Sequence, residues 1–367
     1  MAMISTRPLW PPSLRAKSGN PVKRRSTWIA LSLALLAMTM IAGGVHAAND
    51  DVASFYRGKQ IHFIVGSAPG GTYDLLARTV ARHISAYIPG NPFVIVQNQP
   101  TAGGMVMTNQ LYALGPKDGT AIGVPLNGIP GAPLLQPTAA HYDATKLIWI
   151  GSTNREPYVA YVWHTAPVQS LAELLTRALV VGATTPGTTM NDFPALTNAI
   201  LGTKFKIVRG YESTPQMNQA MERGETEGVG ALGWEAVKAQ MSQWMKDGKI
   251  KMIAQFGLER ASVLPDVPLM IDLAKSPEDR QALTMLFSRT EIGRPYFLPP
   301  GVPPERADAL RRAFDKTMKD EGFIAETEKI GFDLNPLTGE EVQALVADLA
   351  KTPPAVVARV RAVLDQP

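Results

Sequence analysis

The chain has 367 residues, with 36 Lys and Arg against 32 Asp and Glu, and it contains no cysteine. The absence of thiols excludes disulfide bonds, thiolate metal sites and a cysteine nucleophile. The net charge of +4 depends on residues 1–47, which hold six basic residues and no acidic one, so 30 basic residues face 32 acidic ones in the remainder. That balance, near −2, gives no support for a nucleic-acid or anionic-membrane partner.

Residues 1–48 have the composition of a secretory signal peptide. Basic residues precede an uncharged, mostly apolar run over 28–45, and small residues after it supply a cleavage site. Because the run approaches the length of a membrane span, an uncleaved anchor is the alternative. The sequence therefore predicts export to the periplasm, and the remaining residues, about 320, suffice for two domains.

Beyond the leader, strand-like and helix-like segments alternate along the chain. The expected strands are short β-rich runs, at 61–65, 93–96, 121–126, 158–163, 180–183, 205–208 and 251–256. The expected helices carry apolar residues at helical spacing, at 72–88, 105–114, 170–179, 190–201, 215–223, 234–246, 305–319 and 339–364. The last of these is broken at Pro353-Pro354, and a Pro-rich surface run occupies 264–268.

This alternation predicts an α/β architecture of parallel sheets with helices on both faces. We expect two lobes with one sheet each, and the strands at 158–163 and 251–256 crossing between them. The first lobe would comprise 49–160 plus 254–367, and the second 161–253. Ligands in such folds bind beyond the carboxyl ends of the strands.

Two glycine-rich turns, at 67–74 and 98–104, each follow a strand and lead into a helix. The first N–H groups of a helix lack intrahelical acceptors and lie at the positive end of its dipole, so they can hold a carboxylate or phosphate without a basic side chain. A third turn, at 184–189, offers hydroxyls and N–H groups for a second carboxylate across the cleft. The alternatives are tight turns without a ligand and, at the third turn, a helix cap by Thr188 or Thr189.

Asp74 lies in the first turn of the first helix. It could complement the helix dipole, hold the turn and bridge waters, or accept a hydrogen bond from a ligand hydroxyl, amine or ring nitrogen. A carboxylate beside an anion site repels the anion. We therefore expect no direct contact between Asp74 and a ligand carboxylate.

The first turn matches no catalytic or nucleotide-binding motif. It lacks the Gly-Lys-Ser/Thr ending of a P-loop, Gly66 and Gly70 are too far apart for a dinucleotide fingerprint, and Ser67 follows Gly66 directly, which excludes a nucleophile elbow. The histidines share no metal-ligand spacing, and no catalytic triad can be read from the sequence. The sequence therefore predicts no catalytic residues, no metal and no cofactor.

Short motifs follow one another in a specific order along nearly the whole mature chain, at 61–78, 96–104, 116–120, 142–143, 149–151, 170–174, 264–268 and 298–303. In this order they resemble the extracytoplasmic solute receptors of the tripartite tricarboxylate transporter system, also called Bug proteins. The resemblance implies an α/β, two-lobed periplasmic binding protein fold, type II-like, with a mainly parallel sheet flanked by helices in each lobe. It also implies capture of a small, often carboxylated solute for a membrane permease.

The resemblance further implies which residues bind the ligand. The first two turns would hold one carboxylate through backbone amides and ordered water, with Ser67, Ala68, Gly70, Gly71, Thr72, Asp74, Thr101, Ala102 and Gly103. The third turn would hold the distal end of the ligand, with Thr184, Gly187 and Thr188. The family often has Ser-x-Gly-x-Gly-Ser and then His in the third turn, whereas this chain has Asn191 after a Thr-rich turn. The ligand therefore need not be a tricarboxylate.

We expect a monomeric, exported, non-enzymatic receptor that closes two lobes around a small organic anion, above all a carboxylate. Its partners would be the membrane permease subunits of a tripartite tricarboxylate-type transporter, and no nucleic acid. Two alternatives remain open. One is an exported sensory subunit for a membrane kinase, and the other is an exported α/β hydrolase or transferase with a nucleophile and a base that converge only in the fold.

Overall fold

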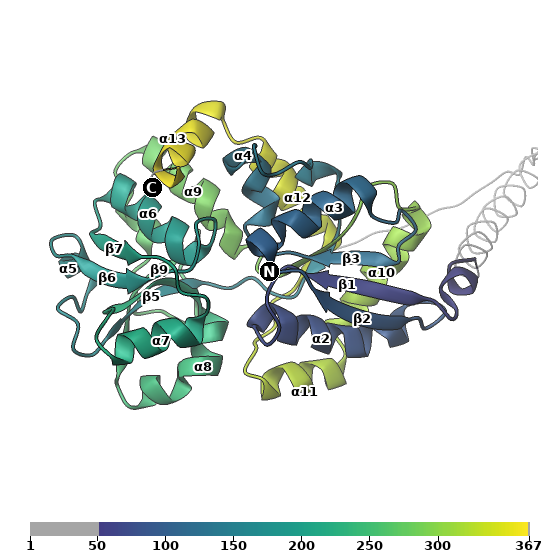
Figure 1. Cartoon of the computed structure of the whole chain (residues 1–367), viewed down its shortest axis with the longest axis horizontal. Coiled ribbons are helices and arrows are strands. Elements are labelled where there is room, and N and C mark those ends of the chain that lie inside the picture. The colour runs from purple at the N-terminus through teal and green to yellow at the C-terminus, as the bar shows by residue number, and fades with distance from the viewer. Residues whose placement is uncertain (1–50, 366–367) are drawn as a thin grey trace, which may run out of the picture. The chain divides into compact units, whose positions relative to one another are not determined.

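The computed structural model describes residues 51–365, so the expected signal peptide at 1–48 lies outside the described residues. Two β-sheets flanked by helices organise the described chain (Figure 1). The six-stranded sheet has the order β11-β4-β10-β3-β1-β2, with β1 Gln60–Val65, β2 Phe93–Asn98, β3 Ala121–Val124, β4 Ile148–Ser152, β10 Pro295–Leu298 and β11 Leu337–Thr338. The five-stranded sheet has the order β7-β6-β8-β5-β9, with β5 Tyr158–Trp163, β6 Leu179–Gly182, β7 Phe205–Val208, β8 Gly228–Gly233 and β9 Ile250–Phe256.

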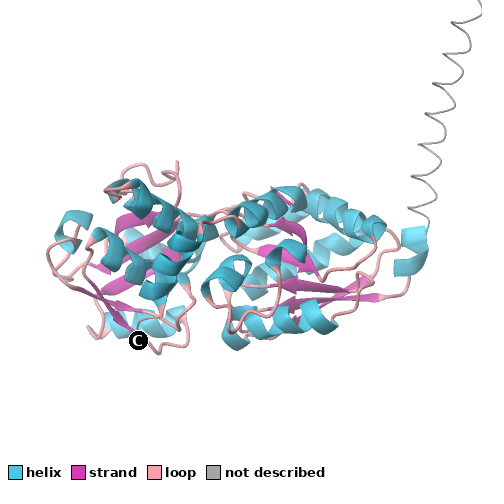
Figure 2. Cartoon of the chain, turned by 90° about the horizontal axis from the view of Figure 1, so that it is seen from above, coloured by secondary structure: helices cyan, strands magenta, loops and turns pink. Residues whose placement is uncertain are grey.

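We call the six-stranded sheet and the helices packed on it lobe 1, and the five-stranded sheet with its helices lobe 2. The helices of lobe 1 are α2 Thr72–Ile84, α3 Met105–Leu114, α4 Ala132–Leu135, α10 Pro304–Thr317, α11 Glu321–Lys329 and α12 Gly339–Ala350. The helices of lobe 2 are α5 Leu171–Leu174, α6 Thr189–Leu201, α7 Thr214–Glu222, α8 Trp234–Lys246, α9 Pro277–Phe287 and α13 Pro354–Leu364. Figure 2 shows both sheets with helices on either side.

Each sheet combines parallel pairs with antiparallel ones, so the two sheets are mixed and not mainly parallel as the resemblance implied. In lobe 1, β1 runs parallel to β2 and β3, and in lobe 2, β6 runs parallel to β7 and β8. These pairs come from consecutive strand–helix–strand units, as the alternating sequence predicts. The antiparallel pairs involve β10 and β11 in lobe 1 and β5 in lobe 2. The parallel part of each sheet therefore carries the turns that the sequence singled out.

Both faces of each sheet are covered by apolar cores. In lobe 1, α2, α10 and α11 pack on one face, and α3 and α12 pack on the other. In lobe 2, α6, α9 and α13 share one core, while α7 and α8 contribute to the second. This burial explains why strands such as β3 and β8 are buried along their whole length.

The sheets place the connections between the lobes differently from the expected domain limits. Both β5 and β9 pair within the five-stranded sheet alone, and α9 and α13 pack in its core. The chain therefore passes between the sheets before β5, between α9 and β10, and between α12 and α13. We propose that lobe 1 comprises 51–152 and 295–350, and lobe 2 comprises 158–287 and 354–364. The other residues between 153 and 353 form connecting segments.

Candidate functional site

The first glycine turn joins β1 to α2. Gly70 has a φ of +78°, in the left-handed region that glycine enters without steric cost, and its N–H donates to Oδ2 of Asp74 at 2.8 Å. Gly71 is the N-cap of α2, and no side chain caps this end of the helix. Within residues 51–365, the N–H groups of Thr72 and Tyr73 have no hydrogen-bond acceptor. These two donors, at the positive end of the helix dipole, are available to an anion.

Asp74 holds the first turn in place. Its side chain is only 3% exposed, and Oδ1 lies 2.8 Å from Nδ2 of Asn98 and 2.9 Å from Nη2 of Arg78. Burial by itself raises the pKa of this carboxyl, but hydrogen bonds from Arg78, Gly70 and Asn98 outweigh burial and lower the pKa below its usual value. Both carboxylate oxygens of Asp74 accept hydrogen bonds from the turn and its neighbours, so of the roles considered for Asp74 the structure supports that of holding the turn.

The lowered pKa of Asp74 also fixes the sign of its pH dependence. The carboxylate has a lower pKa in the folded chain than in the unfolded chain, where a value of about 3.9 is usual. Its contribution to the free energy of unfolding is therefore fully present above that unfolded pKa. It is lost as the pH falls through the folded pKa.

The second turn, η2 (Thr101–Gly104), packs directly against the first. Ala102, Gly103 and Gly104 have φ values of 50°, 62° and 87°, and an alanine in this region costs about 1–2 kcal/mol. A Cβ atom on Gly66 would lie 2.7 Å from Cα of Gly104, so the two turns can approach this closely only without a side chain. The structure thus brings together the two turns that the sequence predicts to form one site.

The third turn joins β6 to α6 in lobe 2 and repeats the arrangement of the first. Gly187 has a φ of +91°, and its N–H donates to Oδ1 of Asp192 at 2.9 Å. The Thr188 hydroxyl donates to the Thr185 carbonyl at 2.8 Å and lies 3.0 Å from the Thr184 hydroxyl, so Thr188 does not cap α6 with its side chain. The Gly187 N–H already has an acceptor within the turn, and the Thr184 and Thr188 hydroxyls stabilise the conformation of the turn.

Asn127 connects the lobes near these turns, and the sequence analysis missed it. Its backbone N–H donates to the Tyr73 hydroxyl at 3.2 Å, while Nδ2 donates to the Tyr158 hydroxyl at 2.9 Å and to the Arg289 carbonyl at 3.1 Å. Burial raises the pKa of Tyr73 to about 12, so the hydroxyl keeps the proton that it donates to the Gly293 carbonyl at 2.8 Å. A polar residue just beyond the carboxyl end of the third strand, where ligands bind in such folds, was the available signal.

Two further residues that the sequence did not predict as part of the site contact the third turn. Nη1 of Arg289 is 2.7 Å from Oδ2 of Asp192, and both side chains are nearly inaccessible, at 5% and 2% exposed. Arg289 belongs to η6 (Ser288–Thr290), on the connection from α9 to β10. An aspartate in the first turn of the helix that follows a glycine turn, as Asp74 is in α2, is the sequence signal for Asp192.

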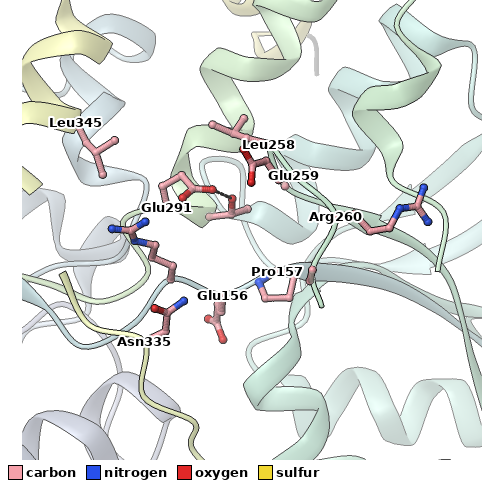
Figure 3. Close-up of a pocket in the computed structure, with 12 residues that line it drawn as sticks. Glu156, Pro157, Leu258, Glu259, Arg260, Glu291, Asn335 and Leu345 are labelled. Carbon is pink, nitrogen blue, oxygen red and sulfur yellow. Dashed lines mark hydrogen bonds between the residues drawn. The ribbon is translucent and has the colours of Figure 1, made fainter. Parts of the chain in front are cut away.

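A pocket of about 370 Å³ lies at the connecting segments and contains none of the expected binding residues. Arg155, Glu259 and Glu291 line it, and Figure 3 shows the Glu156 side chain pointing away from Glu259 and Glu291. Both basic and acidic side chains line this pocket. Arg155 pairs with Glu341 at 3.2 Å, and burial raises the pKa of Glu291. The carboxyl groups of Glu259 and Glu291 in its lining disfavour an anion, so the glycine turns remain the better candidate.

Neither a metal centre nor a membrane span is found in the part of the chain that the structure describes. No group of three or more His, Asp or Glu side chains among residues 51–365 is arranged to hold a metal ion. No helix in the same range is long and apolar enough to cross a bilayer.

A family profile described as tripartite tricarboxylate transporter family receptor matches residues 76–361. The chain belongs to this receptor family. The match extends over parts of both lobes, from within α2 to within α13, and includes the loops of the second and third turns, whereas β1 and the first turn precede it. Members of this family are solute-binding receptors in transport, so the expected non-enzymatic role is confirmed and the hydrolase alternative falls away.

Three solved structures have the same fold as this receptor. The periplasmic binding protein BugD is 20% identical over 84% of this chain and 98% of that chain, with a TM-score of 0.64. An R. palustris protein with adipate is 21% identical, over 83% and 98% of the two chains, with a TM-score of 0.62. MatC from Rhodopseudomonas palustris, with bound malate, is 18% identical, over 83% and 99%, with a TM-score of 0.60. These similarities confirm the expected α/β periplasmic binding protein fold.

Proposed function

We propose that this receptor captures a small carboxylate between its two lobes and delivers it to the permease subunits of a tripartite tricarboxylate-type transporter. The observation that carries the proposal is the uncapped start of α2 beside two interlocked glycine turns. Free N–H groups and the helix dipole favour an anion there, and the exposed glycines Gly70 and Gly71 leave the backbone accessible.

The relatives support the chemical class of the ligand. The solved structures with adipate and with malate contain dicarboxylates, and both share the fold of this chain. The proposal accordingly assigns one carboxylate group to the first two turns. The Thr72 and Tyr73 N–H groups would donate to it, while Asp74 would act only through the shape of the turn.

The composition of residues 1–48 and the family support a periplasmic location. In that compartment the mature chain would act as a monomer. The change between open and closed lobes would report a bound ligand to the permease. The connecting segments between the sheets are where such a motion would take place.

A ligand screen tests the proposal directly. Residues 49–367 would be titrated with mono-, di- and tricarboxylates by thermal shift and calorimetry. A true ligand at a hundredfold excess over its dissociation constant should raise the free energy of unfolding by about 2.7 kcal/mol. The neutral methyl esters of the same acids are the matched controls and should give no shift. Absence of both a shift and a heat signal over the whole panel would overturn the proposal.

A further inference from the structure

Arg289 lies where the two lobes meet at the third turn. Its carbonyl accepts the hydrogen bond from Asn127 of lobe 1, and its Nη1 donates to the Gly187 carbonyl of lobe 2 at 3.3 Å. A Cβ atom on Gly128 would lie 3.6 Å from Cζ of Arg289 and 3.3 Å from the Gly187 oxygen. One residue therefore contacts the loop after β3 and the third turn at the same time.

The third turn is held through the backbone N–H and the backbone carbonyl of Gly187. Asp192 accepts the Gly187 N–H with Oδ1, and it places Oδ2 at 2.7 Å from Nη1 of Arg289. The same Nη1 donates to the Gly187 carbonyl. Arg289 and Asp192 together thus fix the conformation of the third turn, and they use only one of the three guanidinium nitrogens to do so.

The Nε/Nη2 edge of the Arg289 guanidinium makes no hydrogen bond within the described residues. Nε and Nη2 of Arg289 have no hydrogen-bond partner among residues 51–365, although the side chain is only 5% exposed. Neither atom is completely enclosed by protein, so both can be reached from solvent. Donors on a largely desolvated guanidinium are costly to leave unpaired, and the Nε/Nη2 edge has the fork geometry that binds a carboxylate in bidentate fashion.

We propose that Arg289 determines specificity for the far end of the ligand, with Nη1 holding Asp192 and the third turn while Nε and Nη2 bind a second anionic group. This inference rests on the proposed function, because it requires a first carboxylate at the first two turns. It predicts that the receptor distinguishes acids with two anionic ends from acids with one.

The test compares straight-chain diacids, from succinate to suberate, with monoacids of the same lengths. Calorimetry on the wild-type mature chain should show the best diacid binding about tenfold or more tightly than its monoacid, the range expected for a charge-assisted hydrogen bond. In the double variant Arg289→Gln/Asp192→Asn, which removes both buried charges, diacid affinity should fall about tenfold while monoacid affinity stays within about threefold.

Two further variants separate specificity from folding. Arg289→Lys keeps the charge without the fork and should lose part of the diacid preference. Arg260→Gln removes an exposed arginine outside the turns and should change neither affinity. Equal losses for diacids and monoacids, or no loss for either, would overturn the role of Arg289 while leaving the proposed function intact. A wild-type chain that binds no acid in either series would instead overturn both proposals.

Discussion

Replacing Gly71 with Asp should weaken carboxylate binding by about a hundredfold or more and leave the fold intact. Gly71 is the N-cap of α2 with an extended backbone, and a Cβ atom there meets only the Ala68 carbonyl, at 3.5 Å. An aspartate fits this position and would accept the first free N–H groups of the helix. A bound carboxylate about 4 Å away would then be repelled by about 4 kcal/mol at an effective dielectric constant of about 20. The expected loss of affinity, measured by calorimetry, is about a hundredfold or more.

Gly71→Asn is the matched control for this variant. Asparagine caps the same N–H groups without a charge, and it is as good an N-cap as aspartate. It should therefore lose much less affinity than Gly71→Asp, about tenfold, while both variants melt within a few degrees of the wild type. If Gly71→Asp bound acids as tightly as the wild type, the anion could not lie at the start of α2.

Replacing Glu156 with Gln should destabilise the chain by about 3–5 kcal/mol, because it leaves a buried arginine without its counter-charge. Nη2 of Arg294 lies 3.2 Å from Oε1 of Glu156, and the two side chains are 3% and 2% exposed. The guanidinium also stacks against the rings of Tyr73 and Phe332, at 5.2 and 4.9 Å from their centroids. Nε and Nη1 of Arg294 have no partner among residues 51–365, so no other contact replaces the lost charge. Urea unfolding monitored by fluorescence measures the effect.

The double variant Glu156→Gln/Arg294→Met should recover much of the lost stability. Methionine can fill the space between the two rings, and no buried charge remains. Glu225→Gln, which breaks an exposed pair with Arg223, is the surface control and should not change the unfolding midpoint measurably. A double variant no more stable than Glu156→Gln would contradict the account of this ion pair.

The strand–helix pattern and the three glycine turns were predictable because local rules govern them. The helix at 105–114 and the break at Pro353-Pro354 appear as expected, in α3 and between α12 and α13. Glycines after apolar strands produced the turns, because their left-handed backbone needs little help from the rest of the fold. Local chemistry thus located the first two turns, which the structure then brought together.

Strand β8 could not be predicted, because its sequence contradicts strand propensity. Three of its six residues are glycine, which is depleted in strands. Tertiary packing requires glycine at these positions. A Cβ atom on Gly228 would lie 2.3 Å from the Tyr161 carbonyl oxygen, and one on Gly230 would lie 2.4 Å from the Pro194 ring. The strand exists because neighbouring elements cover it on both sides.

The predictions for two other elements, α5 and β10, were wrong for a related reason. Helix α5 ends at Leu174, well before the predicted end at 179, because Leu179 already begins β6 beside β7. Strand β10 is a short run between prolines and was not predicted, yet it fills the gap between β3 and β4. In both cases the pairing of distant strands overrides the local signal.

The contacts that join the lobes could not be predicted from the sequence. Asn127 and Arg289 are 162 positions apart, and Asp192 and Arg289 are 97 positions apart. No local pattern reports such pairs, because only the return of the chain from α9 to β10 places η6 beside the third turn. The sequence could therefore find the backbone of the candidate site but not the side chains that hold it between the lobes.

A crystal structure of residues 49–367 with the tightest acid from the ligand screen tests the central claim most directly. The account predicts a carboxylate oxygen within hydrogen-bond distance of the Thr72 or Tyr73 N–H, with the ligand in contact with both lobes. An acid bound instead in the pocket beside Arg155 and Glu291, with the glycine turns empty, would contradict it.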